Sequence, residues 1–271
     1  KACIAEIENL EVHDAFAEVL EDTLDSWCEK DGRASDVCDC LWVLRRKRGA
    51  NNEVLKYKGR CVYDGRGQKR MAKLNGRELN SYAPCARGST VKCQLACACN
   101  KKRRVRSFDV TGAYLKGDFC DGDASVYARP PPGSRNYING IAVVWKLKVP
   151  LYGEADAGYV WNRTAVKQLC QVQGFKQSEH DPTYFYKRLS DGTFMDIVLY
   201  VDDGLTTDDG SPLADAELAR FNERFKDKTG RDGIKINAPE YFLGANIEET
   251  PHGTCVSARA YVTQLAQRYL P

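Results

Sequence analysis

Apolar residues recur every three or four positions over residues 4–27. This spacing places them on one face of a helix, while the intervening Asp and Glu residues occupy the other face. The pattern therefore predicts one or two amphipathic helices that pack on the rest of the chain. The same spacing over residues 214–228, carried by Leu218, Phe221 and Phe225, predicts another amphipathic helix.

Two more helices are expected in the middle of the chain. An apolar run over residues 90–99 predicts a buried helix that begins near Ser89 or Thr90. Residues 161–174 predict a helix that ends at Gly174, because glycine readily adopts the left-handed backbone found just past helix C-termini.

Residues 37–65 predict a β-ribbon. Residues 37–44 and 54–63 are β-prone and flank the turn sequence GANN, so Asn51 and Asn52 are expected at the bend.

A second hairpin is predicted around two adjacent acids. The apolar run over residues 197–201 stops at Asp202 and Asp203, and another short β-prone run follows Gly204. Two such runs joined by turn residues predict a tight hairpin with carboxylates at its tip. Aspartate is also a common turn residue, so this stretch alone supports a structural and a functional interpretation about equally.

A third acid decides between these interpretations. Asp109 lies inside a β-prone run, where a carboxylate needs a hydrogen-bond partner, an opposite charge or a metal. If its strand lies beside the hairpin, Asp109, Asp202 and Asp203 converge on one sheet surface. Carboxylates that converge without nearby His or Cys suit Mg²⁺ or Mn²⁺, and two such ions roughly 3.5–4 Å apart catalyse transfer at phosphorus. We therefore expect phosphoryl or nucleotidyl transfer.

The charge is unevenly distributed along the chain, although the net charge of the 271 residues is only +3. Acids dominate the first forty residues, and basic clusters follow at residues 45–48, 56–60, 66–77 and 101–106. Such clusters attract phosphate backbones, although short basic runs are as often solvated loops. No run approaches eighteen apolar residues, so we expect no membrane span.

Twelve cysteines invite a disulfide or zinc interpretation, but no paired C-x-x-C and no His at ligand spacing accompany them. Cys97 and Cys99 fall in an apolar run, where a free thiol behaves as a small hydrophobic side chain. We therefore expect reduced core cysteines in an intracellular protein.

Two blocks identify a family. The segments FDVTGAYLKGDF (108–119) and LYVDDG (199–204) resemble the reverse transcriptase domain of Ty1/copia-type LTR retrotransposons. Further blocks resemble that family in the same order along the chain, from about Ser35 to the end: KYKGRCVYDGRGQ (56–68), SYAPCARGSTVKCQLACA (81–98), VYARPPPG (126–133), VWKLKVPLYG (144–153), GFKQSEHDPTYF (174–185) and YFLGANIE (241–248).

The resemblance implies an α/β (α+β) right-hand polymerase core. Residues 1–35 would be a helical lead-in, residues 36–250 the fingers and palm, and residues 251–271 the start of a truncated thumb. The implied activity is RNA-directed DNA polymerisation with two Mg²⁺ or Mn²⁺ ions. The implied partners are an RNA template, a DNA primer or template, and dNTPs. A start without Met suggests a polyprotein fragment.

The resemblance also implies roles for single residues. Asp109 and Asp202 would bridge the two ions with help from the Val110 carbonyl, and Asp203 would bind less directly. A hairpin formed by Phe242, Leu243 and Gly244 would be the primer grip. The helix expected over residues 261–270 would begin the thumb.

Nucleotide-binding residues are assigned in the same way. Lys47 and Arg60 would reach the triphosphate, where charge-assisted contacts to phosphate oxygens are strong. Tyr114 would pack under the sugar and disfavour a 2′-hydroxyl, although a half-buried core aromatic is the alternative. Asp156 stands where the family carries an amide.

Residues 154–159 depart from the family, whose members often carry Leu-Lys-Gln-Ala-Pro-Arg at these positions. Loss of the Lys and Arg removes two cations, and an added acid near phosphates weakens their binding. A divergent active enzyme and an inactive nucleic-acid-binding relic therefore stay open.

Two other functions fit the acids less well. A calcium module lacks the alternating ligands and terminal Glu of an EF-hand loop. A single-metal phosphatase leaves Asp109 and the ordered blocks without explanation. We expect an intracellular, cytoplasmic retroelement protein, and the run KKRRVR (101–106) resembles a nuclear-localisation patch.

Overall fold

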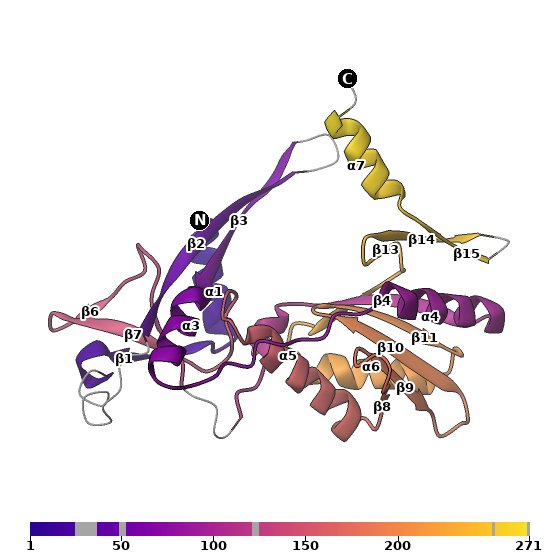
Figure 1. Ribbon diagram of the computed structural model, residues 1–271, viewed down its shortest axis with the longest axis horizontal. Coiled ribbons are helices and arrows are strands. Elements are labelled where there is room, and N and C mark those ends of the chain that lie inside the picture. The colour runs from indigo at the N-terminus through magenta and orange to yellow at the C-terminus, as the bar shows by residue number, and fades with distance from the viewer. Residues whose placement is uncertain (25–36, 49–52, 121–124, 251–252, 270–271) are drawn as a thin grey trace. The chain divides into compact units, whose positions relative to one another are not determined.

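The computed structural model describes residues 1–24, 37–48, 53–120, 125–250 and 253–269. The chain forms two compact units that are interleaved in sequence (Figure 1). One unit comprises Lys1–Ala83 with Tyr114–Thr164, and the other comprises Pro84–Ala113 with Ala165–Pro271. The segments expected from the sequence are consecutive instead, and their assignment to lead-in, fingers, palm and thumb stays a prediction.

The first unit contains a six-stranded sheet with the strand order β1-β7-β5-β2-β3 and β6 paired to β7. Its strands are β1 (Phe16–Leu20), β2 (Val37–Arg48), β3 (Val54–Tyr63), β5 (Tyr127–Arg129), β6 (Tyr137–Ile138) and β7 (Ile141–Leu147). The pair β2–β5 is parallel and the other pairs are antiparallel. Its core includes Leu10, Cys40, Tyr63, Trp145 and Leu151.

The N-terminal prediction is only partly correct. Helix α1 (Ala2–Val12) forms, but residues 16–20 form strand β1 rather than helix. A left-handed residue, Asp14 (φ 51°), ends the helical path, and the ring of Phe16 then stacks on Trp145 with centroids 4.2 Å apart. Antiparallel pairing of residues 16–20 with β7 thus overrides the helical spacing of their apolar residues. Residues 21–24 are helical, and the rest of the predicted segment lies outside the described residues.

The β2–β3 ribbon is confirmed, although its predicted bend at residues 51–52 lies outside the described residues. From the Leu41–Val62 pair toward the turn, most side chains of the ribbon are exposed. Figure 1 shows the two strands running well past the sheet that they belong to. Helix α3 (Gly65–Leu74) follows the ribbon, and the Asp64 side chain caps it by accepting a hydrogen bond from the Arg66 N–H (3.2 Å).

The second unit contains a six-stranded antiparallel sheet with the order β12-β4-β11-β10-β9-β8. Its strands are β4 (Arg104–Val110), β8 (Lys176–Gln177), β9 (Tyr184–Arg188), β10 (Phe194–Tyr200), β11 (Asp203–Asp208) and β12 (Ile234–Asn237). Directly opposed residues of antiparallel strands share a face. The face of Val198 and Leu205 packs against helix α4 (Gly88–Lys101), and the face of Phe108 packs against helix α6 (Pro212–Arg224).

The helices of this unit largely follow the sequence prediction. Helix α4 begins one residue before Ser89, and α6 covers most of residues 214–228. The expected helix before Gly174 is α5 (Ala157–Val166) continued by the π-helix Lys167–Val172, and Gly174 has a positive φ of 75°. A small sheet of β13 (Tyr241–Phe242), β14 (Ala245–Thr250) and β15 (Gly253–Ser257) precedes α7 (Arg259–Tyr269).

The prediction of core cysteines on α4 is wrong. Cys97 and Cys99 are exposed because the helix is amphipathic rather than fully buried, and Val91, Leu95 and Ala98 form its packed face. The buried cysteines lie instead on the β2–β3 pair, at Cys38, Cys40 and Cys61. All cysteines in the described part of the chain are free thiols. Within the same part, no helix is long and apolar enough to cross a membrane.

Candidate active site

The hairpin of β10 and β11 carries two of the predicted acids. Tyr200 pairs with Asp203, so the loop consists of Val201 and Asp202, and Asp203 already belongs to β11. Val201 has φ 56°, a conformation that costs a β-branched residue about 1–3 kcal/mol. A positive φ at the first loop position is typical of type I′ and II′ turns, whose twist matches that of a hairpin. The turn thus fixes both carboxylates at the strand end.

Gly204 allows the neighbouring strand to approach the hairpin. A Cβ added at this residue would lie 2.1 Å from Cζ of Phe108 on β4. The Phe108 ring is buried and packs against Phe221 of α6, with centroids 5.7 Å apart. This packing locks β4 beside β11.

The third predicted acid lies next to the other two. Asp109 on β4 is directly opposite Asp203 on β11, so their side chains emerge from the same face. The Val110 N–H donates a 2.6 Å hydrogen bond to the Asp202 carbonyl, which ties the hairpin loop to the end of β4. The structure therefore brings together the three acids that the sequence placed in distant segments.

The three carboxylates repel one another. The pKa of Asp203 is raised to about 6, first by desolvation and then by the negative charges of Asp202 and Asp109. Asp109 and Asp202 are half-buried and Asp203 is exposed, so the cluster lies at the surface of its unit. A cluster of carboxylates that repel one another favours a cation.

The donor set suits a hard divalent cation. Carboxylate oxygens of Asp109, Asp202 and Asp203 and the main-chain carbonyl of Val110 are the ligand types that Mg²⁺ and Mn²⁺ prefer. Within the described residues, no three His, Cys, Asp or Glu side chains already stand close enough together to hold a metal ion. Binding would therefore draw the carboxylates together.

A lysine lies beside the acids on this face of the sheet. Lys235 on β12 lies directly opposite Asp109, so Tyr200, Asp203, Asp109 and Lys235 form one row across four strands. The Lys235 side chain is exposed. Lys235 was not among the predicted site residues, although the alternation in the segment IKIN (234–237) is a signal that could have placed it on a strand.

In the first unit, two predicted nucleotide-binding residues meet at one tyrosine. The Arg60 guanidinium lies 4.5 Å from the centre of the Tyr152 ring, and the Tyr114 ring packs against the same ring at 5.3 Å. Tyr114 belongs to the short 3-10 helix Ala113–Lys116. Tyr152 holds Arg60 and Tyr114 in one cluster, and the sequence analysis did not single it out.

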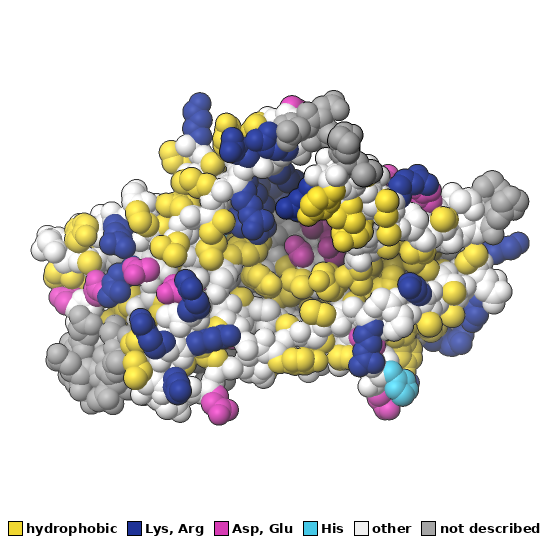
Figure 2. All heavy atoms as spheres, turned by 45° about the horizontal axis from the view of Figure 1, so that its top comes forward, with side chains coloured by type: hydrophobic (Ala, Val, Ile, Leu, Met, Phe, Trp, Pro, Cys, Tyr) yellow, Lys and Arg dark blue, Asp and Glu magenta, His cyan; other side chains and the backbone are white. Residues whose placement is uncertain are grey.

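Lys47 lies farther along the ribbon, opposite Lys56. Register places Arg45, Lys47, Lys56, Lys58 and Arg60 on one face of the ribbon, and we call these five residues the cationic face. Figure 2 shows Lys and Arg side chains gathered along the ribbon. No Asp or Glu of the described residues forms an ion pair with them.

The divergent segment 154–159 forms a polar cluster of its own. Asp156 accepts a 3.0 Å hydrogen bond from Nε2 of Gln68, whose Oε1 accepts one from the Ala155 N–H at 2.7 Å. Glu154 is buried, and desolvation followed by the charge of Asp156 raises the pKa of its carboxyl well above the usual value. Gln68, which the sequence analysis did not single out, organises this segment.

The predicted primer-grip residues do form a hairpin. Phe242 ends β13, and Leu243 and Gly244 form a two-residue loop with φ values of 49° and 82°, as type I′ turns require. The Phe242 side chain is buried against the sheet beside Leu95 and Leu205, while Gly244 is exposed. Its role in binding a primer stays a prediction.

Comparison with known proteins decides the family. A family model described as "Reverse transcriptase (RNA-dependent DNA polymerase)" matches residues 31–269. The chain belongs to this reverse transcriptase family.

Its curated relatives are retrotransposon polyproteins. The chain is 27% identical to the retrovirus-related Pol polyprotein from transposon RE1 of Arabidopsis thaliana over 237 residues, which are 86% of this chain and 15% of that protein. The polyprotein from transposon RE2 of the same plant is also 27% identical, over 86% of this chain and 15% of its own length. The polyprotein from transposon TNT 1-94 of Nicotiana tabacum is 24% identical over 85% and 16%. The chain thus spans about a sixth or less of these relatives.

A solved structure, the foamy viral protease-reverse transcriptase dRH in complex with ds DNA, aligns with 90% of this chain and 35% of that chain. Its sequence identity is 12% and the TM-score is 0.44. The family assignment rests on the sequence matches.

Membership of the reverse transcriptase family confirms the resemblance to copia-type retrotransposons. The helices and sheets of the structure confirm the mixed α/β character of the chain. The individual roles of the aspartates, Lys47, Arg60, Tyr114 and Asp156 stay predictions.

Proposed function

We infer that this chain is an RNA-directed DNA polymerase, which adds nucleotides to a primer 3′-hydroxyl on an RNA or DNA template. The observation that carries this function is the register of Asp109 against Asp203, with Val110 bonded to Asp202, which gathers acids from two distant segments on one sheet face. Membership of the reverse transcriptase family supports the same reaction.

The acids would hold two divalent cations. Asp109 and Asp202 would bind both ions with the Val110 carbonyl, and Asp203 would contribute less directly. When bound, Mg²⁺ or Mn²⁺ lowers the pKa of the attacking hydroxyl and neutralises charge on the departing pyrophosphate. The strained turn at Val201 and the packing of Phe108 over Gly204 keep the carboxylates in position.

Other residues would bind the substrates. The cationic face, which includes Lys47 and Arg60, would attract the triphosphate through charge-assisted hydrogen bonds. Tyr114 would pack under the sugar, and Phe242, Leu243 and Gly244 would support the primer end. A template would be held mainly through its phosphate backbone and its shape.

A second function is favoured by one observation. Residues 154–159 carry Ala155 and Tyr159 where the family pattern has its two cations, and they add two acids, a buried Glu154 and a half-buried Asp156. A chain that keeps the fold and the basic surface but positions substrate poorly would be a nucleic-acid-binding relic.

Primer extension separates the two functions. Purified chain is incubated with poly(rA), oligo(dT), dTTP and Mg²⁺ or Mn²⁺, beside Asp202→Asn and Asp109→Asn. We expect incorporation by the wild type and a loss of at least a hundredfold in each variant. The control Glu240→Gln removes an exposed carboxylate elsewhere in the same unit and should retain activity. Equal incorporation by wild type and Asp202→Asn would remove the catalytic assignment, and none by the folded wild type would favour the relic.

A further inference from the structure

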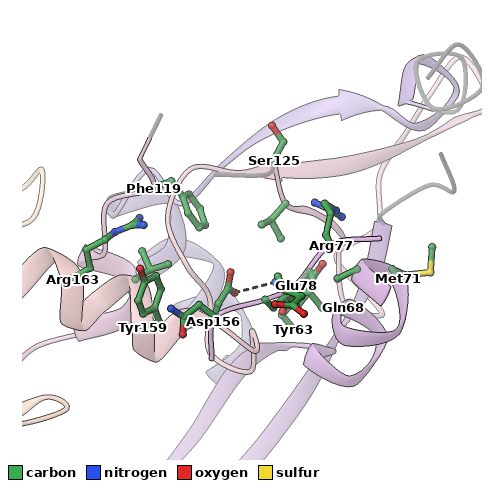
Figure 3. Close-up of a pocket in the computed structure, with 15 residues that line it drawn as sticks. Tyr63, Gln68, Met71, Arg77, Glu78, Phe119, Ser125, Asp156, Tyr159 and Arg163 are labelled. Atoms are coloured by element: carbon green, nitrogen blue, oxygen red, sulfur yellow. Dashed lines mark hydrogen bonds between the residues drawn. The ribbon is translucent and has the colours of Figure 1, made fainter. Parts of the chain in front are cut away.

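A pocket of about 430 Å³ lies in the first unit, within the size range of ligand sites, about 300–1,000 Å³. It is enclosed by α3, the segment 77–80, the side chains of Phe119, Ser125 and Val126, and the start of α5. Figure 3 shows Phe119, Tyr159 and Asp156 on one side, and Arg77, Glu78 and Gln68 on the other.

The carboxylate of Asp156 faces this pocket in a fixed orientation. Gln68 is about nine-tenths buried, and its two hydrogen bonds, from the Ala155 N–H and to Asp156 Oδ1, determine which end of the amide meets Asp156. A flipped amide would place its NH₂ group against the Ala155 N–H. Among the described residues, Gln68 is the one hydrogen-bond donor to the Asp156 side chain. The other carboxylate oxygen and the second lone pair of Oδ1 can therefore accept hydrogen bonds from a ligand with N–H groups.

Asp156 stands at the N-terminal end of α5 but does not cap the helix with its side chain. It directly precedes α5, and its carbonyl accepts the first helical hydrogen bond from the Val160 N–H (2.9 Å). Aspartates at this position usually cap the helix with their side chain. Here the side chain bonds Gln68 instead, so the carboxylate is directed to the pocket rather than to the helix end.

The walls supply flat and cationic surfaces. Phe119 and Tyr159 are half-buried aromatics, and the Arg163 guanidinium lies 5.4 Å from the centre of the Tyr159 ring. Aromatic rings and guanidinium planes stack on nucleobases, and Arg side chains bind phosphates. Arg77 and Arg163 both line the pocket.

We propose that this pocket binds an unpaired guanine of a nucleic-acid strand. Guanine presents two adjacent donors, N1–H and the N2 amine, which match the two oxygens of the Asp156 carboxylate. Adenine and cytosine place a ring acceptor beside their amine, and uracil flanks its single N–H with two carbonyls, so each turns a lone pair toward the carboxylate. The base stacks on the aromatic side formed by Phe119 and Tyr159, while Arg77 and Arg163 contact the flanking phosphates. Nucleic acid as the partner rests on the proposed function.

Oligonucleotide binding in EDTA tests this proposal independently of catalysis. The full chain is titrated with rU₄GU₄, rU₄AU₄ and rU₉ and followed by fluorescence anisotropy. Each charge-assisted hydrogen bond in such a site changes affinity by about tenfold to a hundredfold, so rU₄GU₄ should bind at least about tenfold more tightly than the other two. An inosine at the central position, which lacks the N2 amine, should lie between guanosine and uridine.

Two variants complete the test. Asp156→Asn keeps an acceptor for Gln68 but presents an NH₂ group to the ligand, so it should abolish the guanosine preference. Glu8→Gln removes one exposed charge from α1 of the same unit and should retain it. Equal affinity of the wild type for rU₄GU₄ and rU₉, or an unchanged preference in Asp156→Asn, would overturn the proposal. Failure of primer extension with the preference intact would overturn the polymerase function alone.

Discussion

The acid cluster depends on a few residues that carry no charge. Val201 has an unfavourable positive φ, which allows the hairpin to turn within two residues. Because Gly204 has no side chain, the Phe108 ring can lie across its strand. Two residues without a charged side chain therefore determine where the carboxylates stand.

Gly204→Ala should destabilise the second unit. The added Cβ would overlap the Phe108 ring, and overpacking of a core costs about 1–3 kcal/mol. Urea unfolding should show a lower midpoint, and primer extension should fall because β4 can no longer hold Asp109 beside Asp203. Gly88→Ala at the start of α4 meets no atom within 4 Å and is the matched control. Equal midpoints for the two variants would contradict the packing argument.

The raised pKa of Asp203 predicts a pH dependence of stability. Its value of about 6 in the folded protein exceeds that of an unfolded aspartate, about 3.9, so the folded state binds this proton more tightly. The stabilisation is fully present below about pH 4 and is lost as the pH rises through about 6. Thermal unfolding in EDTA between pH 4 and 7 should show this loss, and Asp203→Asn should reduce it.

Divalent cations should reverse that loss. At pH 7, Mg²⁺ or Mn²⁺ should raise the unfolding temperature of the wild type, because a ligand of the native state stabilises it by mass action. The double variant Asp109→Asn with Asp202→Asn should show no such increase. An equal increase in both proteins would place the metal effect outside this cluster.

Sequence patterns could predict the acids of this site but not their polar and aromatic neighbours. Asp109, Asp202 and Asp203 are unusual because acids interrupt apolar strands, which is visible without coordinates. Gln68 and Tyr152 act through long-range contacts, to Asp156 and to Arg60, and nothing in their local sequence signals those contacts.

The β2–β3 ribbon carries a row of cations that form no ion pair with any described Asp or Glu. Arg45 lies opposite Lys58, and Lys47 lies opposite Lys56, although like charges directly across a strand pair destabilise it. The pKa of Lys58 is lowered by burial first and then by the charge of Arg60, and the further lowering by Lys47 and Lys56 is opposed by the negative charge of Glu6. An element that retains such repulsion is suited to an anionic ligand.

The cationic face should dominate the salt dependence of nucleic-acid binding. Replacing Lys47, Lys56 and Lys58 by Ala should reduce the slope of log affinity against log salt by about 0.7 for each phosphate of a single strand that the variant no longer neutralises. A matched triple variant removes three exposed lysines of the second unit: Lys92, Lys167 and Lys176. Its slope should stay close to that of the wild type in the same titration with an oligonucleotide of mixed sequence. Equal slopes in the two triple variants would show that the ribbon is not the principal binding surface.

Elements with a strong periodic pattern were predictable, and those fixed by distant partners were not. Helices α4 and α6 and both hairpins follow from apolar spacing and turn residues. Strand β1 was predicted as helix because its partner, β7, lies more than a hundred residues away. Helix α3 carries few apolar residues, so its segment gave no helical signal.

The whole molecule is built from two units whose segments alternate along the chain, which a consecutive division from the sequence could not anticipate. In the first unit, β7 pairs with both β1 and β5. Residues from opposite ends of this unit must therefore be present before its sheet can form.

This arrangement predicts which fragments fold. Residues 1–83 joined to residues 114–164 by a flexible linker contain every strand of the first sheet and should unfold cooperatively in urea. A contiguous fragment of similar length, residues 1–134, lacks β7, so β1 and β5 lose their shared partner and the fragment should show no cooperative transition. Circular dichroism during urea titration checks both. The opposite result would be cooperative unfolding of residues 1–134 and no cooperative transition in the linked fragment. It would mean that the sheet does not stabilise the first unit. The stability of this unit would then come from α3, the β2–β3 ribbon and their immediate neighbours.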